Sequence, residues 1–304
     1  MAKYNVLLTT ELPLPPFVKG KVRDTYDLGV HLLIIATDRL SAFDVVLPVG
    51  IPEKGKVLNQ ISAYWFGQTK NIIPNHVIET IYDVKSLDKY LPTANLLKNS
   101  EYLAGRSMVV KKVKRLPVEC VVRGYLAGSG WAEYKKSGTI CGISLPKGMQ
   151  ESQELTEPIF TPTSKADSGH DEPMTLDGVK KLIGSKLAEQ VKEKSIAIYS
   201  FARKQAREKG IIIADTKFEF GLDGNKLIVI DEMLTPDSSR FWDAQKYKVG
   251  QSQPSYDKQP VRDWLEKSGW NKTPPAPLLP PEIVASTAQI YRTAFEKLTG
   301  QKLR

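Results

Sequence analysis

The chain is poor in cysteine and histidine. Its 304 residues include two cysteines, Cys120 and Cys141, and three histidines, His31, His76 and His170. Disulfide-stapled folds need more cysteines, and these histidines lack the spacing of zinc ligands. The sequence therefore predicts neither a disulfide framework nor a zinc centre, and Cys120, within an apolar stretch, is interpreted as a core residue.

Long apolar runs are absent as well. The longest, Leu32 to Ala36, is far shorter than the roughly 20 residues that cross a bilayer. The N-terminus lacks the charged start, apolar run and small-residue cleavage site of a signal peptide. With 41% hydrophobic and 25% charged residues, the composition is that of a soluble globular protein, and we expect a cytoplasmic chain of roughly two domains.

Basic residues outnumber acidic ones, 43 to 34, which gives a net charge of +9. Such an excess suits nucleic acid, an anionic membrane, or a cleft for phosphates and carboxylates. The densest cluster, between Lys111 and Arg115, is interrupted by a valine, and the other cations are scattered. A solvated face is therefore the favoured interpretation, followed by anionic small molecules and, third, nucleic acid.

Periodicity divides the chain into a strand-rich first part, residues 1–115, and a more helical second part, residues 116–304. In the first part, apolar runs punctuated by Gly and Pro predict three strands and one helix. The strands are Leu32–Thr37, Val45–Val49 and Ser107–Val113, and the helix is near Glu53–Lys70. The fold class predicted is α/β (α+β), with a β-rich lobe followed by an α/β lobe.

The second part contains a long helical region from a Thr175 cap to Lys209, with a break expected near Ser195. Ile211–Phe220 and Lys226–Asp231 predict strands joined by a turn at Asp223-Gly224, a strong hairpin signal. Later helices are predicted at Asp257–Lys267 and Glu282–Leu298.

The predicted hairpin carries charged residues on one face. Strand side chains alternate, so Asp215, Lys217 and Glu219 share a face, and we expect the return strand to place Asp231 across from Asp215 to Lys217. Three carboxylates around one lysine suit Mg²⁺ held with nucleotide phosphates. A solvated salt-bridge face is the favoured alternative for this segment in isolation.

A second candidate site is the segment KGKVRDTY, residues 19–26. Gly20 allows the backbone to approach an anion, and Lys21 and Arg23 alternate onto one face, as in a loop that covers phosphates. The segment is neither a Walker A motif nor GxGxxG, and an ordinary hairpin start remains an equal alternative.

A third candidate is an anion site in residues 118–134. An apolar segment that predicts a buried strand has Arg123 near its end, and a Gly-Ser-Gly turn then begins a helix. The backbone amides at the start of that helix, together with Arg123, would form an anion site. Ser129 either contacts the anion or serves only as the N-cap. No His or Asp lies close in sequence to activate Ser129, so a serine nucleophile is not predicted.

Three polar loops complete the set of candidates. Residues 231–242 place hydroxyl groups and Arg240 directly after the hairpin, although a plain turn capped by Asp237 is the alternative. Ser41 and Asp44 lie in a polar loop at a strand end, positioned to face a ligand, and residues 160–172 form a loop long enough to fold over a site.

Together these segments resemble the SAICAR synthetase family of purine biosynthesis. The matching segments, in the family's order across residues 19–265, are KGKVRDTYD, TDRLSAFD, VECVVRGYLAGSGW, FTPTSKADSGHDE, IADTKFEFG, DEMLTPDSSRFW and SYDKQPVRDWL. Ser164 stands where a second threonine is familiar, and the length is that of the family's longer form, with a C-terminal helical extension.

The resemblance implies a two-lobed fold related in layout to ATP-grasp and protein kinase folds, with a β-rich ATP-binding lobe. It implies an ATP-dependent ligase that joins carboxyaminoimidazole ribotide (CAIR) to L-aspartate, giving SAICAR, ADP and phosphate, with Mg²⁺ as the metal. The partners would be these small molecules, without nucleic acid or membrane, and a monomer is expected.

The resemblance also assigns residues. The catalytic residues would be Lys217, Asp215 and Arg123. The ATP-binding residues would be Lys19, Gly20, Lys21, Val22, Arg23, Lys114, Lys165, Glu219 and Asp231, of which Glu219 and Asp231 would also bind Mg²⁺. The substrate-binding residues would be Ser41, Asp44, Arg123, Ser129, Lys217, Ser239, Arg240 and Arg262.

Two other functions are weighed against the ligase. A small-molecule kinase would use the same phosphate loop and carboxylates, but the sequence has no HRD-type catalytic loop. A nucleic-acid-binding module would explain the basic charge, but the sequence lacks the aromatic RNP pattern, zinc spacing and basic tail of such modules.

Overall fold

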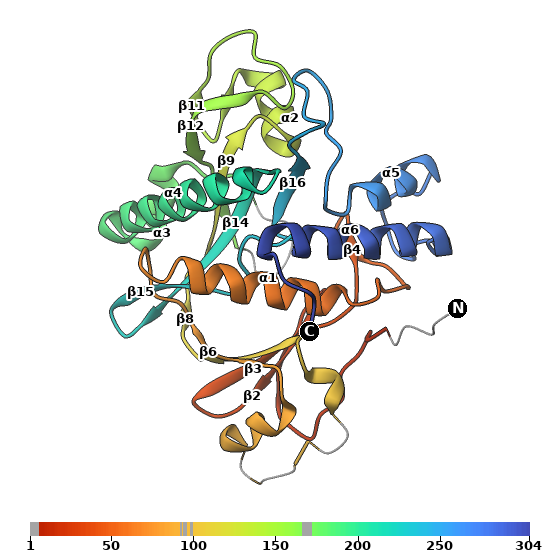
Figure 1. The fold of residues 1–304 in the computed structure, drawn as a ribbon. Helices are drawn as coiled ribbons and strands as arrows, with labels where there is room; N and C mark the ends of the chain where they lie inside the picture. The colour runs from red at the N-terminus through yellow and green to blue at the C-terminus, as the bar shows by residue number, and fades with distance from the viewer. Residues whose placement is uncertain (1–5, 92, 94–95, 98–99, 166–171) are drawn as a thin grey trace. The chain divides into compact units, whose positions relative to one another are not determined.

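The computed structural model describes residues 6–91, 93, 96–97, 100–165 and 172–304 (Figure 1). The chain forms two compact units. The first comprises Met1–Tyr64, His76–Lys112 and Tyr256–Arg304, and the second comprises Trp65–Asn75 and Val113–Ser255. The C-terminal segment thus belongs to the first unit, whereas the sequence-based division placed all of residues 116–304 together.

The position of the C-terminal segment follows from its apolar side chains. They complete a hydrophobic cluster with the early part of the chain, whose buried members are Leu40, Ala42, Leu47, Ile51, Val261, Leu265, Leu279 and Ala288. The segment contains α5 (Gln259–Lys267) and α6 (Pro281–Thr299). Both helices were predicted from periodicity, but which part of the chain they would cover depends on contacts across more than 200 residues of sequence.

The first unit is built on a five-stranded antiparallel sheet. Its strand order is β1 (Pro16–Lys19), β2 (Arg23–Asp27), β3 (His31–Ala36), β7 (Ser107–Lys111) and β6 (Val77–Ile81). The alternation of β3 places Leu33 and Ile35 fully inside the core, while Leu32 and Ile34 remain partly exposed. The strands predicted at Leu32–Thr37 and Ser107–Val113 are confirmed within two residues at each end.

Shorter elements complete the first unit. They are β4 (Ser41–Ala42), β5 (Val45–Val46), and the 3₁₀ helices Val84–Tyr90 and Glu101–Leu103. Of the strand predicted at Val45–Val49, only the first two residues pair. The helix α1 (Lys54–Gln68) lies where the sequence predicts it, near Glu53–Lys70.

The second unit contains a seven-stranded sheet centred on the thirteen-residue strand β14 (Ile211–Asp223). One edge of β14 pairs with β9 and β8, and the other edge pairs with β15 and β16. The remaining strands, β12 and β13, pair with β9. The bounds are β8 (Lys114–Arg115), β9 (Val118–Tyr125), β12 (Glu154–Phe160), β13 (Thr163–Ser164), β15 (Lys226–Ile230) and β16 (Ser239–Asp243).

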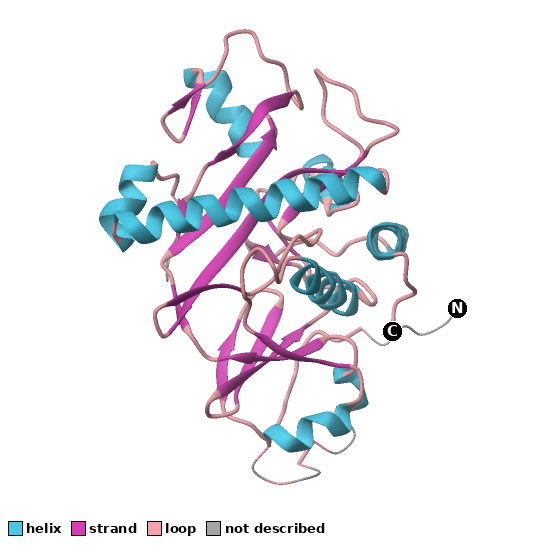
Figure 2. Ribbon diagram, turned by 60° about the vertical axis from the view of Figure 1, so that its left-hand side comes forward, coloured by secondary structure: helices cyan, strands magenta, loops and turns pink. Residues whose placement is uncertain are grey.

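A long helix, α4 (Ser185–Glu208), covers one face of this sheet, where it crosses β14 (Figure 2). The predicted break near Ser195 is wrong: the helical region breaks at Gly184, whose φ of 85° ends α3 (Leu176–Ile183). Thr175 caps α3 as predicted, and its hydroxyl accepts from the Gly178 amide. The Ser195 hydroxyl donates to the Val191 carbonyl, so Ser195 stays within α4.

A small subdomain follows β9. It consists of α2 (Gly128–Ser137), β10 (Thr139–Ile140) and β11 (Ile143–Ser144).

In the described part of the chain, no helix is both long and apolar enough to cross a membrane.

Candidate active site

The pairing of β9 with β14 brings the charged residues of the second unit onto one face. Asp215 lies opposite Arg123, and Lys217 lies opposite Val121. Because alternate residues of paired strands share a face, Glu119 and Arg123 of β9 lie beside Asp215, Lys217 and Glu219 of β14. The predicted shared face of β14 is therefore lined by charged residues of both strands, and all of them except Lys217 are buried.

Two arginines share the carboxylate of Asp215. Its Oδ2 accepts from Arg123 Nη1 at 2.9 Å and also from Arg240 Nη1. Arg123 donates further to the hydroxyls of Ser129, at 2.9 Å, and Thr161, at 3.0 Å. Asp215 and Arg123 are 4% and 7% exposed, so the pairing compensates for a large desolvation cost. This group of residues holds two guanidinium groups in fixed positions, which suits a phosphate or carboxylate ligand.

The Gly-Ser-Gly turn makes room for these arginines. A Cβ on Gly128, whose φ is 54°, would lie 2.0 Å from Arg240 Nη2. The alternative that Ser129 serves as the N-cap is wrong: the N-cap of α2 is Ala127, and the Ser129 hydroxyl accepts from Arg123. The turn therefore serves the arginines as well as starting the helix.

A second group on the same face alternates lysine and glutamate. Lys217 Nζ and Lys165 Nζ both donate to Glu119 Oε1, at 2.7 and 2.6 Å. Lys165 also donates to Glu219 Oε1 at 2.9 Å. Burial by itself would raise the pKa of Glu119, but the charges and hydrogen bonds of Lys217 and Lys165 outweigh it and lower the pKa of this carboxyl. Glu219 and Glu119 in turn raise the pKa of Lys165 against the effect of burial. Both shifts favour the charged form, of Glu119 and of Lys165.

Asp231 lies in a different place from the one predicted. In β15, Ile230 pairs with Glu219 and is the last strand residue, so Asp231 follows the strand rather than lying across from Asp215 to Lys217. The chain leaves the sheet there because Asp231 has a φ of 68°. It returns as β16, whose Ser239 pairs with Thr216. On the edge of β14 opposite β9, the Asp215 region therefore lies beside β16, which carries Arg240.

The loop between β15 and β16 is organised by Thr235. Its hydroxyl accepts from the amides of Asp237 and Ser238, at 3.2 Å each, and donates to Glu232 at 2.6 Å. The alternative of a turn capped by Asp237 is thus corrected: Thr235 is the capping residue. At the start of β16, the hydroxyls of Ser239 and Thr216 are 2.8 Å apart. Lys114 is exposed on β8.

In the first unit, the predicted phosphate loop is a tight turn between β1 and β2. The Gly20 amide donates to the Arg23 carbonyl at 2.7 Å. A residue that sequence reasoning did not single out, Arg39, fixes the turn: it donates to the carbonyls of Gly20 and Lys21, at 2.9 and 3.0 Å. Arg39 is itself held by the buried carboxylate of Asp24 at 2.6 Å. Arg39 thus holds the carbonyls of Gly20 and Lys21, while the carbonyl of Val22 accepts from the amide and the hydroxyl of Thr37, at 3.0 and 2.8 Å.

The structure brings two predicted site residues of the first unit together. Lys21 Nζ lies 2.6 Å from Asp44 Oδ1, and both side chains are more than half exposed. Lys19 donates instead to the Thr10 carbonyl at 3.3 Å. A third predicted residue, Ser41, accepts through its carbonyl from Lys258 at 3.3 Å.

Arg262 lies on α5, close to the segment that carries Ser41. The preceding residue, Val261, belongs to the same buried cluster as Leu40 and Ala42.

Within the described residues, no group of three or more His, Cys, Asp and Glu side chains could hold a metal ion. The loop predicted at residues 160–172 lies partly outside the described residues, since 166–171 are not described, and His170 is among them.

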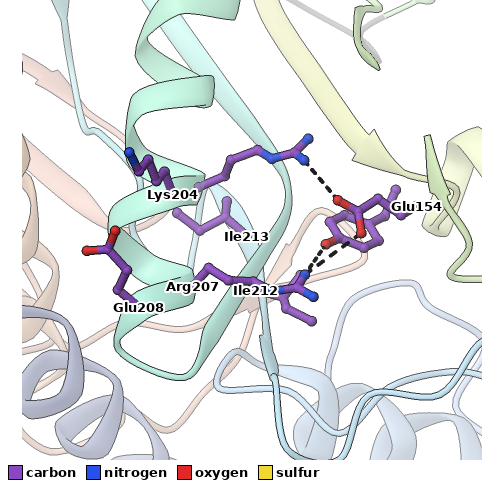
Figure 3. Close-up of a pocket in the computed structure, with 8 residues that line it drawn as sticks. Glu154, Lys204, Arg207, Glu208, Ile212 and Ile213 are labelled. Atoms are coloured by element: carbon purple, nitrogen blue, oxygen red, sulfur yellow. Dashed lines mark hydrogen bonds and ion pairs between the residues drawn. The ribbon is translucent and has the colours of Figure 1, made fainter. Parts of the chain in front are cut away.

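A hollow of about 370 Å³ lies elsewhere in the second unit and contains none of the predicted site residues (Figure 3). Four of its polar side chains, those of Tyr125, Glu154, Arg203 and Arg207, are paired with one another. Arg203 lies 2.8 Å from one oxygen of Glu154, Arg207 lies 3.9 Å from the other, and Arg207 donates to the Tyr125 hydroxyl at 2.7 Å. The two ion pairs join α4 to β12.

Comparison with known proteins identifies the family. Residues 16–277 match the profile of the SAICAR synthetase family. This chain belongs to the SAICAR synthetase family. It is 54% identical to the phosphoribosylaminoimidazole-succinocarboxamide synthase of Geobacter metallireducens and 55% identical to that of Geobacter sulfurreducens, each over 98% of this chain and 99% of the relative.

Solved structures agree with this assignment. The SAICAR synthase from Saccharomyces cerevisiae complexed with SAICAR is 46% identical, with a TM-score of 0.89 over 97% of this chain and 99% of that one. A type-2 SAICAR synthetase in complex with ADP is 25% identical, with a TM-score of 0.68 over 94% of this chain and 99% of that one. The predicted family and mixed α/β fold class are both confirmed.

Proposed function

We propose that this chain carries out the family's reaction with the residues described above. As a ligase of purine biosynthesis, it joins the carboxylate of CAIR to the amine of L-aspartate and forms SAICAR, while ATP becomes ADP and phosphate. The observation that carries the assignment of roles is the face shared by β9 and β14, where two arginines and two lysines are fixed by three carboxylates.

The chemistry explains why such a face is needed. A carboxylate is a poor electrophile, so the γ-phosphoryl group of ATP is first transferred to a carboxylate oxygen of CAIR and ADP leaves. The aspartate amine then attacks the acyl carbon, the C–N bond forms, the nitrogen loses a proton, and phosphate departs. Phosphoryl transfer of this kind is accelerated mainly by positioning and charge neutralisation, which fixed ammonium and guanidinium groups supply.

We assign ATP-binding roles in each unit separately. In the first unit we assign the phosphates to the turn of Lys19, Gly20, Lys21, Val22 and Arg23, whose shape is held by Arg39. In the second unit we assign Lys165 and Lys114 to the nucleotide. Lys165 is well suited because it is held between two carboxylates with its charge retained.

The carboxylates of Glu219 and Asp231 fit a magnesium ion by their chemistry. Mg²⁺ prefers oxygen ligands and is usually bound by one or two carboxylates, with phosphate oxygens and water completing six positions. The second unit offers two carboxylates at the end of the β14–β15 pair. When bound, the ion would neutralise charge on the ATP phosphates.

The remaining residues are assigned to the substrates. Arg123, Ser129, Ser239 and Arg240 would bind the phosphate or carboxylate of the ribotide, and Asp215 would hold both guanidinium groups in place. Lys217 would neutralise the group being transferred. In the first unit, Ser41 and Asp44 would line the substrate pocket, with Arg262 as a further anion contact.

Replacing Arg240 with alanine is expected to lower kcat/KM for CAIR, because one charge-assisted contact to the anion is lost. The expected loss of transition-state stabilisation is about 2–3 kcal/mol. Steady-state kinetics at varied CAIR would show the change. Arg203→Ala is the matched control, since Arg203 pairs with Glu154 at the surface of the same unit and is expected to leave kcat/KM unchanged. An unaltered kcat/KM in the Arg240 variant would reject its role.

The function as a whole is tested by incubating the purified chain with Mg-ATP and CAIR, with and without L-aspartate. ADP release and SAICAR formation are followed together, the latter by mass spectrometry. We expect equal amounts of ADP and SAICAR only when all three substrates are present. ADP release without aspartate and without SAICAR would favour a kinase or ATPase instead.

A further inference from the structure

One buried carboxylate of the β9–β14 face is assigned to no substrate, nucleotide or metal ion in the scheme above. Glu119 is 3% exposed, and a single oxygen, Oε1, accepts from both Lys217 and Lys165. Its position follows from strand register. Glu119 lies opposite Thr163, so Lys165 follows two residues later on the β13 side. On the other side Lys217 lies opposite Val121, diagonal to Glu119.

We propose that Glu119 is a positioning residue, which holds the ammonium group of Lys217 at the reacting group and the ammonium group of Lys165 against Glu219. This inference rests on the proposed function, in which Lys217 neutralises the transferred group. Glu119 itself touches neither substrate nor metal in this scheme: it acts through the two lysines.

The physical reason lies in the lysine side chain. Lysine carries its charge on a flexible four-carbon stem, and holding it in one place costs conformational entropy. Lys217 is 39% exposed, so packing alone does not fix its position. A charge-assisted hydrogen bond to a carboxylate that is rigid because it is buried in a central strand does fix it.

Glu119 also lets two like charges stand close together. Two ammonium groups that approach the same oxygen repel each other, and the carboxylate between them offsets that repulsion. Loss of the carboxylate is therefore expected to drive Lys217 and Lys165 apart. Lys217, the more exposed of the two, then moves toward solvent.

The test compares Glu119→Gln with the wild type by steady-state kinetics of SAICAR formation and by the crystal structure of each. Glutamine has the shape of glutamate but no charge. We expect kcat to fall by about 10- to 100-fold, the equivalent of one charge-assisted hydrogen bond. We expect the backbone of β9 and β14 to be unchanged and the Lys217 ammonium group to be displaced.

Two results would each overturn the inference: a kcat close to that of the wild type, or a reduced kcat with Lys217 still in its wild-type position. If Glu119→Gln does not fold, Glu119→Asp is tested by the same two measurements. Aspartate keeps the charge, but its side chain is one methylene shorter, so the carboxylate lies farther from the two lysines. Glu157→Gln, an exposed carboxylate on the neighbouring β12, is the matched control and should leave both unchanged. Wild-type protein that forms no SAICAR would instead refute the proposed function.

Discussion

Replacing Asp231 with asparagine is expected to reduce kcat by about 10³-fold or more while the fold stays intact. The loss corresponds to the several kcal/mol of charge stabilisation that a bound metal supplies. The fold is expected to survive because Asp231 has a φ of 68°, and asparagine is one of the few residues that adopts this left-handed conformation readily. The measurement is SAICAR formation as a function of Mg²⁺ concentration, with circular dichroism to confirm folding.

Asp223→Asn is the matched control for this experiment. Asp223 is the last residue of β14 and pairs with Lys226 at the turn of the same hairpin, at the end of the strand farthest from Asp215. It is expected to leave both kcat and the Mg²⁺ dependence unchanged. A near-wild-type kcat for Asp231→Asn at saturating Mg²⁺ would remove Asp231 from the metal site.

Asp215→Asn is expected to lower the free energy of unfolding by about 3–5 kcal/mol, since it removes the one carboxylate that two guanidinium groups share. Arg123 is the more costly of the two to leave without its partner, because it is 7% exposed. Folded Asp215→Asn protein is also expected to bind CAIR more weakly, because both arginines lose their fixed positions. Urea unfolding and the KM for CAIR measure the two effects.

The control for Asp215 is Glu154→Gln, which weakens an ion pair of similar composition at a more exposed position (Figure 3). Surface pairs of this kind contribute about 1 kcal/mol or less, so little change in stability is expected. A loss for Asp215→Asn no greater than that for Glu154→Gln would show that the buried pairing does not stabilise the fold as inferred.

Local signals in the sequence located the longer helices and the hairpin of β14 and β15. The strand at residues 211–220, the Asp223-Gly224 turn and a return strand from Lys226 are confirmed, because side-chain periodicity and turn chemistry depend on near neighbours; the predicted position of Asp231 across from Asp215 to Lys217 is wrong. The break at Gly184 was missed although glycine was its cause, because the apolar stripe continues through it. Recognition of seven motifs in order then identified the family.

The candidate site was predicted less completely. Its arginines and lysines stand out in the motifs, but Glu119 and Arg39 do not, because their importance arises only from what the fold places beside them. Glu119 lies within the motif VEC, where its neighbours are apolar and indicate an ordinary buried strand. Its two lysine partners come from positions 46 and 98 residues further along the chain.

The sequence by itself determined the family, the reaction class and the residue types that the chemistry requires, because these are carried by short motifs in a fixed order. Only the tertiary structure decided which strand lies beside Asp215, where Asp231 leaves the sheet, and which unit takes residues 256–304. Strand neighbours and core partners are chosen by pairing and burial between distant segments. No local pattern encodes that choice, since many strands with the same alternation are equally able to pair.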